Sequence, residues 1–373
     1  FAAQAVGAGK EQEVRAVLGR SLLLAVGLGI LLIVMQWPIR LAAFSILGGS
    51  ESVESIAQDY FRLRIWGAPA TLASFALMGL LIGLGRSKAL LIVQLFLNGL
   101  NISLDMLFAG VMKLGVTGIA LGTVVAEWTT VIFAGWLVIR VLKRREVPGN
   151  SFWPMDRILD RATLIKTLSA NADIMIRTLL LVFSFAFFTN QSARFGDVVL
   201  AANHILLQLV SFAAFFLDGY AFVVEALTGA ALGAGKRASF DLAVKRSSVL
   251  AVITAVILAL SIWLLGGFAI ELLTYLTEVR LVAVESLFLA ASYVLCSCAA
   301  FQLDGIFIGA SCTRQMRNAA FMSLSVFLAA WWLLIDGYGV TGLWWAMIIY
   351  VLARAASLLL YFGSLRNSIS LEN

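Results

Sequence analysis

Three polar side chains lie on one face of an apolar segment near residue 100 and have the chemistry to bind a cation. Asp105 follows Asn101 by four residues, and Asn98 lies about one turn earlier, so a helix places all three on one face. A carboxylate with amide neighbours in a partly dry cavity can hold a proton or coordinate Na⁺ through oxygen atoms. The alternative without ion binding is a carboxylate at a helix end whose hydrogen bonds are already made by backbone groups or water. We favour a site for a coupling cation.

A second group of ionisable residues occurs in apolar segments later in the chain. Asp218 and Glu225 are seven residues apart and share a helical face. Asp304 lies in another apolar segment, and Arg177 and Arg354 are the arginines that fall clearly within such segments. The carboxylates either line a substrate pathway or pair with an arginine to fix helix packing, and both interpretations stay open.

The pair Asp173 and Arg177 favours a structural interpretation. Asp173 and Arg177 are separated by four residues, and we expect them to neutralise each other on one helix. Glu127 has no obvious partner in the sequence.

Enzymatic chemistry has little support in the residue types. His204 is the only histidine, so neither a histidine metal cluster nor a Ser-His pair can form. Cys296 and Cys298 do not have a zinc spacing, and no second pair exists. We therefore predict no enzyme activity, no catalytic residues, no bound metal and no cofactor, with H⁺ or Na⁺ acting only as a coupling ion.

The elements that carry these residues are predicted to cross a membrane. Apolar residues make up 61% of the chain and charged residues only 13%, which excludes an ordinary soluble domain. Segments of about 20 apolar residues recur along the chain, and each is long enough to span a bilayer. The sequence therefore predicts an all-α integral membrane protein. Ten complete spans are expected, near 21–47, 60–84, 88–111, 115–142, 163–190, 198–224, 246–273, 285–310, 318–336 and 340–363.

Charge distribution predicts the orientation of these spans. The net charge is +6, but most Lys and Arg residues fall in alternate connections, whereas the acidic segment Gly49–Asp59 belongs to the opposite set. This pattern is typical of membrane topology rather than nucleic-acid binding. We expect the basic connections and the C-terminus to be cytoplasmic, in the plasma membrane, which is the inner membrane of a bacterium.

Internal repetition organises the chain. Gly7-Ala8-Gly9-Lys10 recurs as Gly233-Ala234-Gly235-Lys236, 226 positions later, and Gly79 and Gly83 match Gly305 and Gly309 at the same shift. Gly115-Val116-Thr117-Gly118 matches Gly339-Val340-Thr341-Gly342 at a shift of 224. Such self-similarity indicates two copies of one structural unit.

The repeat also predicts the lobes and their boundaries. The repeat partner of the span near residue 163 would begin before Phe1, so we expect the first span and most of the second to be missing here. The expected regions are an incomplete N-terminal lobe at 1–145, a cytoplasmic inter-lobe loop at 146–162, and a C-terminal lobe at 163–373. Six spans in each lobe would make parallel repeats, which favours alternating access.

Several stretches resemble the multidrug and toxic compound extrusion (MATE) transporters. They are Asn98-x-x-Asn101-Ile102-x-Leu104-Asp105 and the repeated Gly-Val-Thr-Gly. The segments Asp218-Gly219-Tyr220 and Gln302-Leu303-Asp304-Gly305-Ile306 resemble the DNA-damage-inducible, DinF-like branch in particular.

The resemblance implies a twelve-span, two-lobe antiporter that expels organic, often cationic compounds in exchange for H⁺ or Na⁺. It also implies that Asn101 and Asp105 belong to a polar cluster that binds the coupling ion, with Thr123 from the next span. The first-span aspartate of that cluster would lie before Phe1. The implied partners are the lipid bilayer and small organic substrates, without nucleic acid, and we expect a functional monomer.

A lipid-linked oligosaccharide flippase of the same superfamily is the main alternative. Flippases line a central cavity with several basic residues that hold pyrophosphate, whereas only Arg177 and Arg354 fall clearly within spans here. A membrane-embedded enzyme would need clustered catalytic groups at span ends. A purely structural membrane protein would not need carboxylates and amides together within its spans.

Overall fold

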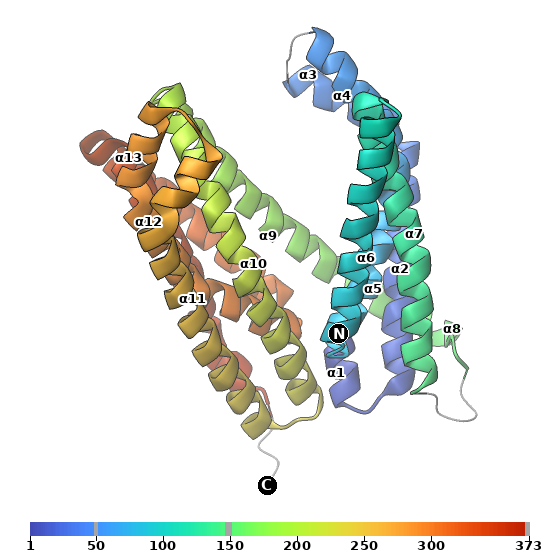
Figure 1. The fold of residues 1–373 in the computed structure, drawn as a ribbon. Coiled ribbons are helices and arrows are strands. Elements are labelled where there is room, and N and C mark those ends of the chain that lie inside the picture. The colour runs from blue at the N-terminus through green and yellow to red at the C-terminus, as the bar shows by residue number, and fades with distance from the viewer. Residues whose placement is uncertain (48–50, 146–150, 370–373) are drawn as a thin grey trace. The chain divides into compact units, whose positions relative to one another are not determined.

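The computed structural model describes residues 1–47, 51–145 and 151–369, and these residues form helices joined by short turns (Figure 1). The chain divides into two compact units. The N-terminal unit is Ala2–Leu164, and the C-terminal unit is Ile165–Asn373 together with Phe1. Residues 49–50 of the acidic segment and 146–150 of the expected inter-lobe loop lie outside the described residues.

In the N-terminal unit, α2 packs on α5, and both α5 and α6 pack on α7. Pro38 and Pro69 mark two breaks in its helices, because proline has no N–H to donate to the carbonyl four residues earlier. The first break separates α2 from α3, and the second places a short 3₁₀ turn, η1, before α5. The elements are α1 (Ala2–Gly7), α2 (Glu11–Val34), α3 (Gln36–Leu47), α4 (Glu51–Arg64), η1 (Ile65–Gly67), α5 (Ala68–Gly83), α6 (Ser87–Asp105), the π-helical η2 (Met106–Val111), α7 (Gly115–Lys143) and α8 (Met155–Ile158).

In the C-terminal unit, α12 is the central helix and packs against α10, α11 and α13 (Figure 1). Its many buried residues include small ones such as Ala290, Ala300 and Gly305, which let neighbouring backbones approach closely. The elements are α9 (Arg161–Ala193), α10 (Asp197–Gly233), α11 (Arg237–Leu273), α12 (Thr277–Gly309) and α13 (Thr313–Asn367).

Nine helices within the described residues are long and apolar enough to cross a membrane. The expected spans 318–336 and 340–363 both fall within α13, which consists of two helices that meet at a kink, where Gly339 has a non-helical backbone (φ 53°, ψ −128°). The two expected spans therefore agree with the structure. The expected span 21–47 differs from it, because α2 begins at Glu11 and ends at Val34. The chain is thus a multi-pass, all-α membrane protein, as the sequence predicts.

The internal repeat is visible in the backbone of the two units. Residues with a positive φ lie at turns that open the next helix, where a residue without a Cβ meets no steric penalty. Three such pairs are related by the repeat: Gly9 (66°) and Gly235 (69°), Gly85 (64°) and Ser311 (57°), and Gly115 (57°) and Gly339 (53°). The sequence alone did not reveal the second pair, because serine replaces glycine in it.

Repeated glycines also set the distance between helices. A Cβ on Gly83 would meet Ala2, and a Cβ on Gly309 would meet the Glu225 carbonyl and Thr228, which is the repeat counterpart of Ala2. A Cβ on Gly305 would meet the carbonyl oxygen of Ala221. The close approach of α10 to α12 at Gly305 therefore needs glycine, and it holds the adjacent Asp304 in the interior of the unit.

We predict that Gly305→Ala destabilises the protein by about 1 to 3 kcal/mol, because the new methyl group overlaps backbone atoms of α10 that cannot rotate away. Gly219→Ala is the matched control, since a Cβ there meets nothing within 4 Å. Thermal unfolding in detergent measures both variants. Equal unfolding temperatures for the two would contradict the proposed close packing.

Candidate functional site

The predicted cation site of the N-terminal unit lies where α6 passes into η2, opposite α7. The side-chain nitrogen of Asn101 donates a hydrogen bond to the Thr123 hydroxyl, with an Nδ2–Oγ1 distance of 3.1 Å. That hydroxyl donates in turn to the carbonyl of Ile119 at 3.0 Å. Thr123 is thereby fixed, and it holds the side chain of Asn101 on the α7 side of α6.

Asp105 is one turn farther along α6 and lies against Gly122 of α7. A Cβ at Gly122 would come within 2.5 Å of Asp105 Oδ1, so only glycine leaves room for the carboxylate. Oδ1 is buried and has no hydrogen-bond partner among the described residues. A buried carboxylate oxygen without a hydrogen-bond donor is costly, so this oxygen is open to a further partner.

A π-helical segment begins directly after Asp105. The wider turn of η2 (Met106–Val111) changes the helical register on the C-terminal side of Asp105. π-Helical segments are rare in proteins, and those that do occur are often found at functional sites. No feature of the sequence indicated it.

Asn98 does not join this group. It is exposed on α6, and its side chain makes no recorded hydrogen bond within the described residues. The structure therefore brings together Asn101 and Thr123, places Asp105 beside them, and leaves Asn98 apart.

Glu127 has a partner that the sequence did not indicate. Its carboxylate accepts two hydrogen bonds from the guanidinium of Arg64, at 2.7 and 2.6 Å. Close by, the indole nitrogen of Trp128 donates to the carbonyl of Trp66 at 3.1 Å. These contacts tie α7 to α4 and η1. Because Arg64 and Glu127 lie 63 residues apart on different helices, no spacing rule could have paired them.

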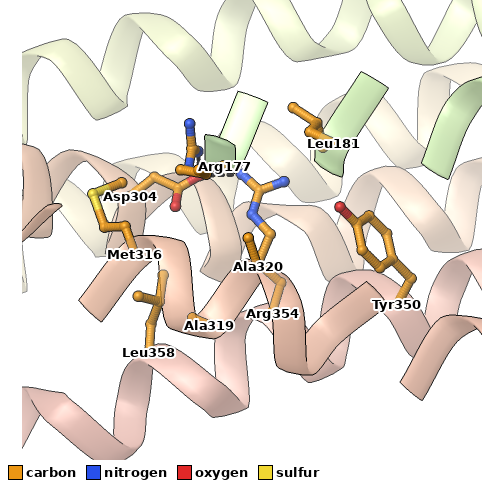
Figure 2. A pocket seen from close by; sticks show the side chains of 9 residues that line it. All are labelled: Arg177, Leu181, Asp304, Met316, Ala319, Ala320, Tyr350, Arg354 and Leu358. Atoms are coloured by element: carbon orange, nitrogen blue, oxygen red, sulfur yellow. Dashed lines mark hydrogen bonds and ion pairs between the residues drawn. The ribbon is translucent and has the colours of Figure 1, made fainter. Parts of the chain in front are cut away.

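In the C-terminal unit, two arginines share one carboxylate. Arg177 of α9 and Arg354 of α13 both donate to Oδ2 of Asp304 on α12 (Figure 2). Of the two interpretations left open by the sequence, this geometry matches an ion pair that holds helices together. A small cavity beside the pair has a volume of about 10 Å³, which is room for about one water molecule. Its lining residues are Arg177, Leu181, Asp304, Met316, Ala319, Ala320, Tyr350, Arg354 and Leu358.

The prediction that Asp173 and Arg177 neutralise each other is wrong. Asp173 instead accepts a hydrogen bond from Arg317 at 2.6 Å and one from the Thr313 hydroxyl at 3.1 Å. The two residues share a helix, but Asp173 turns to the start of α13 and Arg177 to α12. A partner on a packed neighbouring helix displaces the i,i+4 contact, which is worth only about 0.2–0.5 kcal/mol.

Asp218 and Glu225 lie half-buried on α10 and form no ion pair with a side chain in the described part of the C-terminal unit. Asp218 is within electrostatic range of both arginines and of Asp304. The two carboxylates are therefore left for water or for a ligand. Within the described residues, no group of three His, Cys, Asp or Glu side chains is placed to hold a metal ion.

Comparison with known proteins gives matches in both units. The sequence model of the MatE family matches residues 1–107 and 174–331. DNA damage-inducible protein F of Escherichia coli is 34% identical over 360 residues, which cover 95% of this chain and 76% of that protein. Protein DETOXIFICATION 42 of Arabidopsis thaliana is 26% identical over 307 residues. The matched region covers 80% of this chain and 56% of that protein.

Solved structures share the fold. An outward-facing multidrug resistance MATE family transporter of the MOP superfamily superposes with a TM-score of 0.88 at 19% identity, over 99% of this chain and 82% of that one. A MOP superfamily transporter from Pyrococcus furiosus gives a TM-score of 0.88 at 18% identity, with the same coverage.

We predict that Glu127→Gln lowers the stability of the protein by about 1 to 3 kcal/mol, because it leaves Arg64 partly buried without its counter-charge. The side chains of Glu127 and Arg64 are 9% and 28% exposed. Arg62→Gln is the control, since Arg62 is 67% exposed and 4.0 Å from Asp59. Unfolding in mixed micelles measures the difference, and an equal effect of both substitutions would refute a structural role for the Arg64–Glu127 pair.

Proposed function

This chain belongs to the MatE family of membrane transporters, and we propose that it exports small organic compounds in exchange for H⁺ or Na⁺. Alternating access of two lobes would carry the exchange. The names of relatives support this class of substrate, because they include a probable multidrug resistance protein from Synechococcus that is 29% identical over 62% of this chain.

The proposal of cation coupling rests on Asp105. Its unpartnered, buried Oδ1 faces Gly122, and the Asn101–Thr123 hydrogen bond lies one turn away. A proton can neutralise this carboxylate directly. Na⁺ can bind through the carboxylate together with amide and hydroxyl oxygens, which are the ligands that hard cations prefer. Asn98 is the weakest member of the proposed set because it is exposed.

The two compact units are the proposed lobes. Each carries the same pattern of positive-φ turns and glycine-mediated helix contacts, which supports an origin as two copies of one unit. Alternating access in such proteins is a movement of one repeat against the other around a fixed site. We propose that the protein lies in a bacterial inner membrane as a monomer. We place the inter-lobe connection and the C-terminus in the cytoplasm, because the alternate connections that include them carry most of the Lys and Arg residues, which is typical of cytoplasmic loops.

A lipid-linked oligosaccharide flippase has weaker support. The pyrophosphate of such a substrate carries more than one negative charge. Arg177 and Arg354 already share Asp304, so together the three residues offer only one uncompensated positive charge.

We predict that Asp105→Asn abolishes gradient-driven export, because the amide keeps the shape of the carboxylate but cannot take up or release a cation. Efflux of a fluorescent organic dye should fall at least about tenfold in vesicles energised by a pH gradient or by a Na⁺ gradient, whichever drives the unchanged protein. Comparing the two gradients also identifies the coupling ion.

Asp59→Asn is the matched control, since Asp59 is an exposed carboxylate of the same unit. It should transport at the unchanged rate, and both variants should insert and fold. Unchanged dye efflux by Asp105→Asn would remove Asp105 from the mechanism.

A further inference from the structure

A groove between α11 and α12 lies on the surface of the C-terminal unit. Its volume is about 230 Å³, and an apolar cavity of about 150 Å³ is already large enough to hold benzene. Ser292 is the one hydroxyl residue of the lining, and it donates to the Phe288 carbonyl on its own helix at 2.8 Å. A mainly apolar molecule therefore fits the groove. The lining residues are Val256, Ala259, Leu260, Trp263, Phe288, Ala291, Ser292 and Leu295.

The walls of the groove are held in place by packing between the two helices. The rings of Trp263 and Phe288 are exposed and meet edge to face, with centroids 6.3 Å apart. Beside them, Leu287 of α12 occupies the space that a side chain at Gly266 of α11 would need. The groove is thus formed before any ligand arrives, which lowers the free-energy cost of binding.

Gly267 continues the groove towards the end of α11. It follows Trp263 by four residues, so both lie on the same side of the helix. A Cβ at Gly267 would meet nothing within 4 Å. The missing side chain leaves an open path from the groove to the turn that joins α11 to α12.

Arg280 lies at that turn and has a free donor. Its Nε donates to the carbonyl of Thr274 at 2.8 Å, and its Nη2 donates to the carbonyl of Glu271 at 3.0 Å. These two bonds fix the guanidinium over the last carbonyls of α11. Its Nη1 has no recorded partner, and Arg280 forms no ion pair within the described residues. One nitrogen and the positive charge are therefore available to an anionic group.

A carboxylate lies at the same end of the groove. Glu271 follows Gly267 by four residues, is exposed, and forms no ion pair in the part of the chain that the structure describes. Glu278 and Glu285 of α12 are each about half a turn away from Leu287, which faces α11, so they lie on the other side of α12. Glu271 is thus the carboxylate on the groove side, beside the positive charge of Arg280.

The spacing of these features matches one leaflet of a bilayer. Arg280 precedes the expected span 285–310 by five residues, which places it at a membrane surface. It precedes Leu295, at the far end of the groove, by 15 residues, or about 22 Å of helix. Half of a bilayer, headgroups included, is about 20–22 Å thick. A lipid phosphate at Arg280 would therefore place an acyl chain along the groove.

We propose that this groove binds a phospholipid with an ethanolamine headgroup. Its phosphate binds Arg280, its ammonium group binds Glu271, and one acyl chain passes Gly267 and lies between α11 and α12. The primary ammonium has N–H donors for a carboxylate, whereas the trimethylammonium of a choline headgroup has none. The inference goes beyond the proposed export function and does not depend on it, because it concerns a lipid bound by the C-terminal unit alone.

The experiment is native mass spectrometry of the delipidated protein in non-ionic detergent. Phosphatidylethanolamine and phosphatidylcholine with the same palmitoyl and oleoyl chains are titrated separately, and the affinity for the first bound lipid is measured. Phosphatidylethanolamine should bind the unchanged protein at least about threefold more tightly, which is the size expected of a partly exposed ion pair.

Two substitutions separate the parts of the headgroup. Arg280→Gln should weaken the binding of both lipids about tenfold, because both carry the phosphate and a charge-assisted hydrogen bond is lost. Glu271→Gln should remove the preference for ethanolamine and leave the affinity for phosphatidylcholine unchanged. Glu278→Gln is the matched control, since Glu278 is an exposed carboxylate on the other side of α12, and it should change neither affinity.

A third substitution tests the acyl-chain path without touching a charge. Gly267→Leu should weaken the binding of both lipids, because its side chain enters the open path beside Trp263. The unfolding temperature of the lipid-free protein should stay the same, since a Cβ at Gly267 meets no neighbour. Gly363→Leu is the control, because Gly363 is exposed on α13 and a Cβ there also meets nothing within 4 Å.

Three results would overturn the proposal. They are equal affinity of the unchanged protein for the two lipids, an ethanolamine preference that survives Glu271→Gln, and lipid affinities that Gly267→Leu leaves unchanged. The first needs no variant, so a variant that fails to fold does not prevent the test.

Discussion

A charged side chain inside a membrane span needs a partner, because lipid offers neither counter-charge nor hydrogen bonds. This constraint sorts the buried carboxylates of the chain into two classes. Glu127, Asp173 and Asp304 are bound by arginines, and each links helices that are distant in sequence. Asp105, Asp218 and Glu225 form no ion pair within the described structure. The paired carboxylates hold the helix bundles together, and we propose that the unpaired ones are available to ions or substrates.

The sequence predicted which side chains lie together where a single helix places them. Asn101 and Asp105 share a face because they are four residues apart, and a helix fixes that relation whatever surrounds it. It did not predict side-chain pairing where a second helix supplies the partner. Asp173 and Arg177 have the spacing of an ion pair, yet Arg317 and Asp304 on neighbouring helices bind them instead. Side-chain pairing across helices depends on packing, which residue spacing does not encode.

The fold was easier to predict than the site, because the lengths of apolar segments and their repetition can be read directly from the sequence. The repeated Gly-Ala-Gly-Lys and Gly-Val-Thr-Gly correspond to turns with a positive φ in both units. The turn at Ser311 was missed because its residue type conceals the conformation that Gly85 shares. The boundaries of the spans were less accurate, since the expected span 21–47 differs from α2, which begins at Glu11 and ends at Val34. The two spans expected on either side of Gly339 agree with the kink that divides α13 there.

The distinction between paired and unpaired carboxylates is most directly tested by labelling with dicyclohexylcarbodiimide. This apolar reagent reacts with protonated carboxyl groups inside membrane proteins, and peptide mass spectrometry locates the modified residues. Our account predicts a label on Asp105 and none on Glu127 or Asp304, because arginine guanidinium groups already bind the carboxylate oxygens of these two residues. Labelling of Glu127 and Asp304 as readily as Asp105, or no label on Asp105, would contradict it.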